Sequence, residues 1–185
     1  MARARVLSSK TIYSGRVFGV RQDQVLEPGG VRATRDVVTH NGSVVVLPVF
    51  ADGRILLIRQ YRHAVGTFLW ELVAGRVEPG ESPLRAARRE LLEETGCTAR
   101  RFQRLMKVFP TPGFVSEWMV VYLATGLQQG AARPEADERI VSRRFSLRRA
   151  EQMIRRGTLC DAKSIAAILF YTSFIKAKQP QRSSR

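Results

Sequence analysis

Cysteine is scarce in this 185-residue chain, where Cys97 and Cys160 are the only two. Two cysteines are too few for a disulfide framework or a zinc site, and a chain of this length can form a core without cross-links. No apolar run reaches the roughly 18 residues that a membrane-spanning helix requires, and the opening MARARVLSSKTIY lacks the apolar core of a secretory signal. We therefore expect a cytoplasmic protein in which both cysteines are small buried apolar residues.

Acidic residues are also few, with 16 Asp and Glu against 31 Lys and Arg, and the formal net charge is +15. Such an excess raises the question of nucleic-acid binding. The excess lies in the flanks, because residues 1–42 hold seven basic and three acidic side chains and residues 139–185 hold twelve and two. Four arginines of the last flank share one side of a predicted helix, and a solvated face is the commoner explanation for such a stripe: Arg148, Arg149, Arg155 and Arg156. We expect neither nucleic acid nor a membrane among the partners.

The order of predicted elements is that of a mixed α+β protein. β-prone runs on either side of a turn at residues 28–30 predict a small N-terminal antiparallel sheet. The apolar run 43–50 and the run 54–61 are predicted to form a hairpin around Asp52-Gly53. Further strands are expected at 69–73, 104–108, 118–124 and 140–145, and helices at 83–95, 147–156 and 162–178. Asp161 is the expected N-cap of the last helix, and Gly157 the expected C-cap of the helix before it.

The segment GRVEPGESPLRAARRELLEETGC, residues 75–97, is unusually rich in carboxylates. Ser82 suits an N-cap, and Gly96 suits the left-handed C-terminal position, so the residues between them are predicted to form a helix. At about 100° per residue, Glu90, Glu93 and Glu94 lie on one face of this helix. Because like charges at this spacing repel, a hard divalent cation such as Mg²⁺ is a natural partner. The alternative is an ordinary surface helix whose glutamates pair with neighbouring arginines: Arg85, Arg88 and Arg89.

The wider pattern decides between these two interpretations. It is G-x5-E-x7-R-E-U-x-E-E-x-G-U, where U is apolar, and the chain fits it at every specified position: Gly75, Glu81, Arg89, Glu90, Leu91, Glu93, Glu94, Gly96 and Cys97. The segment resembles the Nudix box, the signature of Mg²⁺-dependent hydrolases that act on a nucleoside diphosphate linked to another group. The resemblance implies a Nudix-type α/β/α sandwich with a mixed β-sheet. It also implies an N-terminal sheet over 1–42 and a Nudix hydrolase domain over 43–178. The composition of residues 179–185, QPQRSSR, predicts a disordered tail.

The same resemblance assigns roles to the residues of the box. Glu90, Glu94 and the main-chain carbonyl of Ala74 would be metal ligands, with Glu93 either a ligand or an orienter of the metal's water. Arg89 would orient these carboxylates.

Two further residues of the segment would support the site. Glu81 would brace the loop or hold a metal water, and Gly75 would permit the tight turn that brings the backbone close to the metal. The metal implied is Mg²⁺, with Mn²⁺ as the alternative.

Features outside the box resemble the ADP-ribose pyrophosphatases within this family. Pro112 lies 16 residues after Gly96, and the segments IRQYR (58–62), WELVAGRVEPGES (70–82) and RDVVTHNGSVVVLPV (35–49) resemble that subfamily. Two departures stand beside these matches. Val73 replaces a common proline, and Asn41-Gly42-Ser43 replaces a common Pro-Gly-Ala, although neither position is a presumed ligand.

The resemblance also points to a general base and to substrate contacts. The base would be Glu138 in the acidic segment PEADERI, with Glu135 as a substitute in the same loop and a plain solvated turn as the alternative. Four residues are candidates for contacts to the diphosphate and ribose, each with an alternative role in a surface ion pair: Arg35, Arg59, Arg62 and Glu117. Trp70 and Trp118 are expected to be packing residues.

The predicted function is Mg²⁺-dependent hydrolysis of ADP-ribose to AMP and ribose 5-phosphate, or of a related nucleoside diphosphate sugar. The resemblance further implies a homodimer in which each N-terminal sheet reaches the partner's site. The alternatives are another Nudix substrate, including RNA-linked ones, and an ADP-ribose sensor without catalysis.

Overall fold

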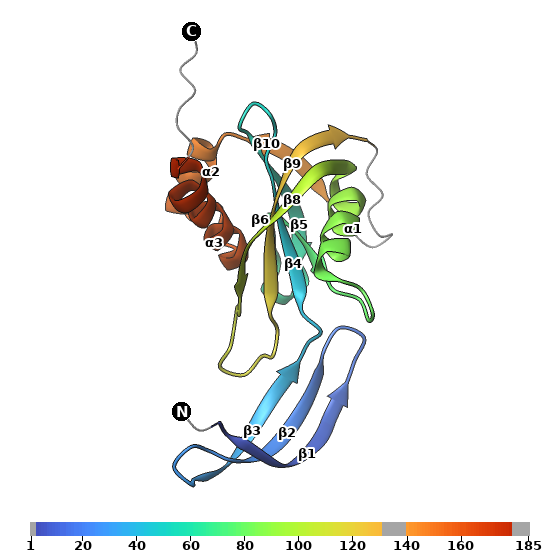
Figure 1. The fold of residues 1–185 in the computed structure, drawn as a ribbon, viewed down its shortest axis with the longest axis vertical. Helices are drawn as coiled ribbons and strands as arrows, with labels where there is room; N and C mark the ends of the chain where they lie inside the picture. Colours follow the sequence, from blue (N-terminus) through green and yellow to red (C-terminus); the bar gives the residue numbers. More distant parts are fainter. Residues whose placement is uncertain (1–2, 131–139, 179–185) are drawn as a thin grey trace. The chain divides into compact units, whose positions relative to one another are not determined.

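The computed structural model describes residues 3–130 and 140–178, which form two compact units (Figure 1). The first unit lies within Met1–Gly42 and Phe109–Met119, and the second lies within Ser43–Val108 and Val120–Arg185. Within the described ranges, no helix is both long and apolar enough to cross a membrane.

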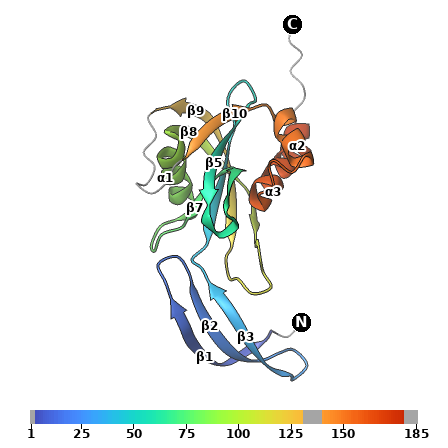
Figure 2. The same ribbon diagram turned by 180° about the vertical axis from the view of Figure 1, so that it is seen from behind.

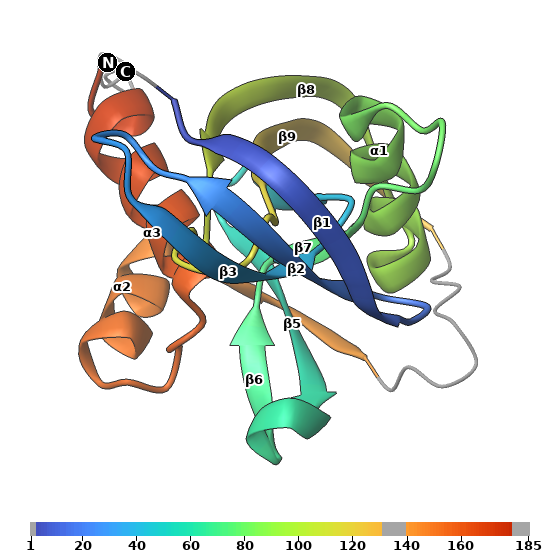
Figure 3. The ribbon, with the colours of Figure 1, turned by 90° about the horizontal axis from the view of Figure 1, so that it is seen from below.

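The first unit is built on one antiparallel sheet. Its strands are β1 (Arg5–Ser14), β2 (Gly19–Leu26) and β3 (Arg32–Thr39), in the order β1-β2-β3 (Figure 3). The predicted turn between β2 and β3 is present, with Gly29 and Gly30 at φ angles of 93° and 84° that favour glycine. The segment 109–118 continues from this sheet, because the amide of Val38 donates to the carbonyl of Phe114 at 2.8 Å.

The second unit has two sheets between helices. One sheet has the order β10-β5-β6 and the other the order β7-β4-β9-β8. Helix α1 lies on one side of the sheets, and α2 and α3 lie on the other (Figures 1 and 2). This arrangement confirms the expected sandwich. The bounds are β4 (Ser43–Pro48), β5 (Ile55–Arg62), η1 (His63–Val65), β6 (Thr67–Glu71), β7 (Val73–Arg76), α1 (Pro83–Thr95), β8 (Cys97–Val108), β9 (Met119–Gln129), β10 (Val141–Phe145), α2 (Leu147–Arg155), α3 (Ala162–Phe170), η2 (Tyr171–Ile175) and η3 (Lys176–Lys178).

The predicted hairpin over 43–61 is wrong beyond its turn. Gly53 makes the turn at a φ of 79°, but β4 and β5 then diverge into different sheets and share only the isolated bridge between Val49 and Ile55. The physical reason is that a strand has two edges. Both edges of β4 are taken by β7 and β9, and both edges of β5 by β10 and β6.

The predicted strand 69–73 crosses between the sheets in the same way. Strand β6 ends at Glu71 in one sheet, and β7 begins at Val73 in the other. Leu72 lies between them and is completely buried. Between β4 and β7 the chain therefore changes sheets twice, and the second of these crossings lies directly before the carboxylate-rich segment.

Three smaller expectations also differ from the structure. Strand β1 was not predicted, since all ten of its residues are exposed and no apolar face marks it. The predicted helix over 162–178 is α-helical only to Phe170 and then continues as a π-helical turn and a 3₁₀ turn. Cys97 is buried as expected, but Cys160 is exposed.

Candidate active site

Helix α1 begins and ends where its capping residues predict. The Oγ of Ser82 accepts a hydrogen bond from the amide of Arg85 at 3.3 Å, and Pro83 occupies the first turn. Gly96 ends the helix at a φ of 71°, and its amide donates to the carbonyl of Leu92 at 2.8 Å. Ala86, Ala87 and Leu91 are completely buried. The helix thus has one packed face, and its position in the unit is fixed by that face.

Arg89 gathers three carboxylates of the segment around one guanidinium. Its Nε and Nη2 donate to Glu81 at 3.2 and 3.1 Å, and its Nη1 donates to Glu90 at 2.7 Å and to Glu93 at 3.0 Å. Its Nη2 also donates to the carbonyl of Arg76 at 3.0 Å. The resemblance to the Nudix box predicts that Arg89 orients these carboxylates, and these hydrogen bonds are the contacts through which it can do so.

The charges in this cluster shift the pKa values of its members. Burial alone would lower the pKa of Arg89, but the hydrogen bonds and charges of Glu81, Glu90 and Glu93 outweigh burial and raise it. The hydrogen bond from Arg89 lowers the pKa of Glu81 below its usual value. Both groups are therefore ionised at neutral pH.

Glu90 lies directly against the backbone of strand β7. A Cβ built on Gly75 would overlap the Glu90 carboxylate, with Oε2 at 2.5 Å and two further carboxyl atoms closer still. Only glycine leaves room for that approach. Gly75 is part of the strand, where it pairs with Val44, rather than part of a turn. Its neighbour Ala74 pairs with Val45 in the same ladder.

Glu94 is the buried carboxylate of the helix, with 5% of its surface exposed. The charge of Glu94 is one of those that raise the pKa of Arg62, after the larger effect of a hydrogen bond from Arg62 to Glu71. The box carboxylate and this arginine therefore lie within electrostatic range of each other. Glu93 is more exposed, with 35% of its side chain accessible.

The residues of this segment fit a hard divalent cation. Among residues 3–130 and 140–178, no three Asp, Glu, His or Cys side chains are already gathered into a metal-binding group. Carboxylate and main-chain carbonyl oxygens are the donors that Mg²⁺ prefers. Glu90 already lies against β7, the strand that carries the Ala74 carbonyl, in a space that a Cβ on Gly75 would fill. The donor set and this close approach are therefore compatible with the cation.

The two candidate arginines of β5 lie on opposite faces of their sheet. Arg59 and Arg62 are three positions apart, and side chains alternate along a strand. The Arg59 guanidinium lies 5.1 Å from the centre of the Phe68 ring. Arg62 lies on the other face and donates two hydrogen bonds, both of 2.8 Å, to the Glu71 carboxylate.

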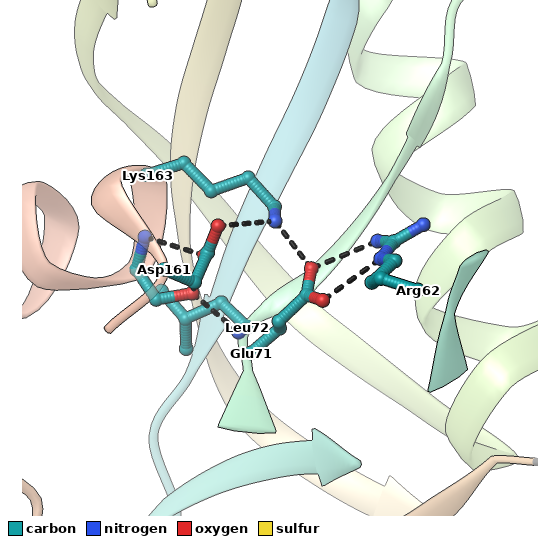
Figure 4. A network of polar contacts seen from close by, with 6 residues as sticks. Arg62, Glu71, Leu72, Asp161 and Lys163 are labelled. Carbon is teal, nitrogen blue, oxygen red and sulfur yellow. Dashed lines mark hydrogen bonds and ion pairs between the residues drawn. The ribbon is translucent and has the colours of Figure 1, made fainter. Parts of the chain in front are cut away.

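The Glu71 network was not predicted as part of the site (Figure 4). Glu71 is 1% exposed and also accepts a hydrogen bond from Lys163, which lies 92 positions further along the chain. Burial would raise the pKa of Glu71, but the hydrogen bonds and charges of Arg62 and Lys163 lower it. A signal was present in the sequence. An acidic residue within the apolar run LWELV (69–73) requires a buried cationic partner, although the sequence does not say which one.

The remaining candidates lie in the first unit, where they have contacts of their own. Arg35 pairs with Glu27 at 3.0 Å. Glu117 lies 3.6 Å from the Nδ1 of His40. Pro112 is exposed in a turn.

The two tryptophans are packed as expected. The ring of Trp118 packs on the Cα of Gly42, and the ring of Trp70 meets Phe145 edge to face at 5.0 Å. The candidate bases Glu138 and Glu135 lie outside the described residues.

Comparison with known proteins identifies the class. A sandwich whose strand-loop-helix brings several carboxylates around one arginine is the architecture expected of a Nudix hydrolase. The NUDIX domain matches residues 39–168, and the chain belongs to this family of hydrolases. Members of the family generally need a divalent metal.

Individual relatives agree with this assignment. The chain is 40% identical over 167 residues to an ADP-ribose pyrophosphatase of Mycobacterium tuberculosis, covering 88% of this chain and 80% of that one. It is 32% identical over 180 residues to an ADP-ribose pyrophosphatase of Bacillus subtilis, covering 96% of this chain and 97% of that one. A crystal structure of an ADP compounds hydrolase has the same fold, with a TM-score of 0.84, 24% identity and 96% of each chain covered.

Proposed function

We propose that this protein hydrolyses the diphosphate bond of ADP-ribose, giving AMP and ribose 5-phosphate, with related nucleoside diphosphate sugars as further substrates. The observation that carries the proposal is the close approach of Glu90 to Gly75 within a cluster organised by Arg89. The similarity to two ADP-ribose pyrophosphatases over most of the chain supports the choice of substrate.

The metal in this proposal is Mg²⁺, with Mn²⁺ as the alternative. Glu90, Glu94 and the carbonyl of Ala74 would hold it, and Glu93 would be a further ligand or orient water. When bound, the cation would neutralise negative charge on the phosphoryl oxygens and help to activate water.

The protein's own groups would supply the rest of the chemistry. Glu138 would take a proton from the attacking water, with Glu135 as its substitute. Arg62 would bind the diphosphate, because a guanidinium can make two parallel hydrogen bonds to phosphate oxygens. Arg35, Arg59 and Glu117 remain candidates for further contacts to the diphosphate and ribose.

A homodimer is part of the proposal. Strand β1 is an edge strand of the first unit, and six large apolar side chains of this region are exposed: Val6, Leu7, Ile12, Tyr13, Val17 and Phe18. An exposed apolar edge of this kind favours pairing with a second copy of the chain. The proposed location is the cytoplasm, and no nucleic-acid partner is proposed.

A substrate panel tests the proposal. We would compare kcat/KM for ADP-ribose, ADP-glucose, a GDP-sugar, a dinucleoside polyphosphate and capped RNA, in Mg²⁺ and in excess chelator. ADP-ribose should be preferred, and the chelator should abolish its turnover. Preference for another substrate would overturn the ADP-ribose assignment. Tight ADP-ribose binding without turnover of any substrate would favour the sensor alternative.

A further inference from the structure

The Glu71 carboxylate is held between two cations that come from different parts of the fold. Arg62 lies on β5, and Lys163 lies in the first turn of α3. Figure 4 shows the two cations on opposite sides of the carboxylate. Arg62 uses Nε and Nη2 for both Glu71 oxygens, and Lys163 donates to Oε2. The Glu71 side chain is 1% exposed, so its charge depends on these partners rather than on water.

The lysine end of this network is fixed. Lys163 donates to Asp161 at 2.9 Å, and Asp161 also caps α3 by accepting from the amide of Ser164 at 3.0 Å. The Oγ of Ser164 accepts from the amide of Leu72 at 2.7 Å. This tie joins the beginning of α3 to the point where the chain crosses from β6 to β7. Lys163 is 12% exposed and has little freedom to move.

The arginine end is more open. The Arg62 side chain is 39% exposed, and its Nη1 makes no hydrogen bond to any residue within 3–130 or 140–178. The charge of Glu94 contributes to the raised pKa of Arg62, after the hydrogen bond to Glu71. One edge of the Arg62 guanidinium therefore binds Glu71, and a second edge is available. The guanidinium also lies within electrostatic range of Glu94, a carboxylate of the box.

We infer that Glu71 and Lys163 are positioning residues that hold Arg62 for the diphosphate. This inference rests on the proposed function, since it assigns a target to the free edge of Arg62. An unrestrained arginine samples many rotamers, whereas a guanidinium already held by a carboxylate loses less freedom when it binds phosphate. Lys163 offsets part of the Glu71 charge, so Arg62 keeps more of its attraction for an anion.

A double-mutant cycle between Glu71→Gln and Arg62→Met tests this inference. Every variant keeps the pair between Lys163 and Asp161, so none leaves Lys163 without a carboxylate. Each single variant should lower kcat/KM for ADP-ribose about tenfold, mainly through KM, as expected for the loss of a charge-assisted contact. The double variant should be no more than twofold worse than Arg62→Met alone, because Glu71 acts through Arg62.

A second readout does not depend on turnover. The Kd of ADP-ribose, measured by calorimetry in excess chelator, should rise about tenfold in each single variant and no further in the double variant. Lys163→Gln should show a smaller rise and Lys163→Arg should restore affinity, while Lys176→Gln, an exposed lysine at the end of the same helical segment, should have no effect. If Glu71→Gln fails to fold, these lysine variants still test the inference.

The outcomes separate this inference from the proposed function. If the losses of kcat/KM in the two single variants multiplied in the double variant, the positioning role would be overturned. Wild-type turnover of ADP-ribose would then still leave the proposed function intact. A wild-type protein that neither bound nor hydrolysed ADP-ribose would overturn both.

Discussion

Replacing Gly75 by alanine should disable the site while leaving the protein folded. A Cβ at this position would lie 2.5 Å from Oε2 of Glu90 and closer to two other carboxyl atoms. Non-bonded heavy atoms normally approach to about 3.5 Å, so the carboxylate must retreat by at least about 1 Å. That movement would strain its hydrogen bond of 2.7 Å with Arg89.

The effect on stability should be small. Gly75 does not have a positive φ, and the group that must move is the far end of a flexible side chain. A compatible Gly→Ala change stabilises by about 0.4–1 kcal/mol through the unfolded chain, which offsets part of the strain. We expect the free energy of unfolding to change by less than about 1 kcal/mol, as measured by denaturant titration.

The effect on activity should be large. Misplacing a catalytic group by about 1 Å can cost roughly 100-fold, which corresponds to about 2.7 kcal/mol of transition-state stabilisation. We therefore expect kcat/KM for ADP-ribose to fall about 100-fold, with weaker affinity for Mg²⁺. The control is the same change in a Glu90→Gln background, where it should add little because Glu90 is already disabled. Full activity of Gly75→Ala, or an equal loss in both backgrounds, would refute the steric argument.

Two further predictions concern stability. Gly42→Ala should destabilise the protein by about 2 kcal/mol or more in denaturant titration, because Gly42 has a φ of 92° and an added Cβ would overlap the Trp118 ring. Unchanged stability would contradict this packing. Glu71→Gln should lower the free energy of unfolding by about 3 kcal/mol near pH 7. This is the low end for breaking a buried ion pair, because Arg62 is partly exposed and Lys163 keeps its ion pair with Asp161. The folded pKa of Glu71 lies below the usual glutamate value of 4.5. The charge of Glu71 therefore stabilises the fold above that pH, and this contribution is lost as pH falls through the folded pKa. The stability difference between wild type and Glu71→Gln should narrow below about pH 4.5, and a constant difference down to pH 3 would contradict the assignment.

The parts of the fold that local signals encode could be predicted from the sequence. Helix α1 has the predicted bounds, because Ser82, Pro83 and Gly96 act within one turn of each end. The turn at Asp52-Gly53 was predicted for the same reason, but the partners of β4 and β5 were not. Strand pairing depends on which other strands reach the two edges, and this information lies far away in the sequence.

The same distinction applies to the candidate site. Arg89 and its carboxylates lie within one short segment, so their spacing in the sequence was enough to predict that they lie close together. Glu71 and Lys163 are 92 positions apart, and neither belongs to the box. Only the crossing of the chain between the two sheets and the position of α3 bring them together.

The most direct test of the account is product analysis of the purified protein with ADP-ribose and Mg²⁺, beside Glu94→Gln and Glu138→Gln variants. The wild type should give equimolar AMP and ribose 5-phosphate. The rate should fall at least about 1,000-fold in Glu94→Gln and clearly in Glu138→Gln, as expected when a metal ligand or general base is removed. No AMP from the wild type in either Mg²⁺ or Mn²⁺, or undiminished AMP from Glu94→Gln, would contradict it.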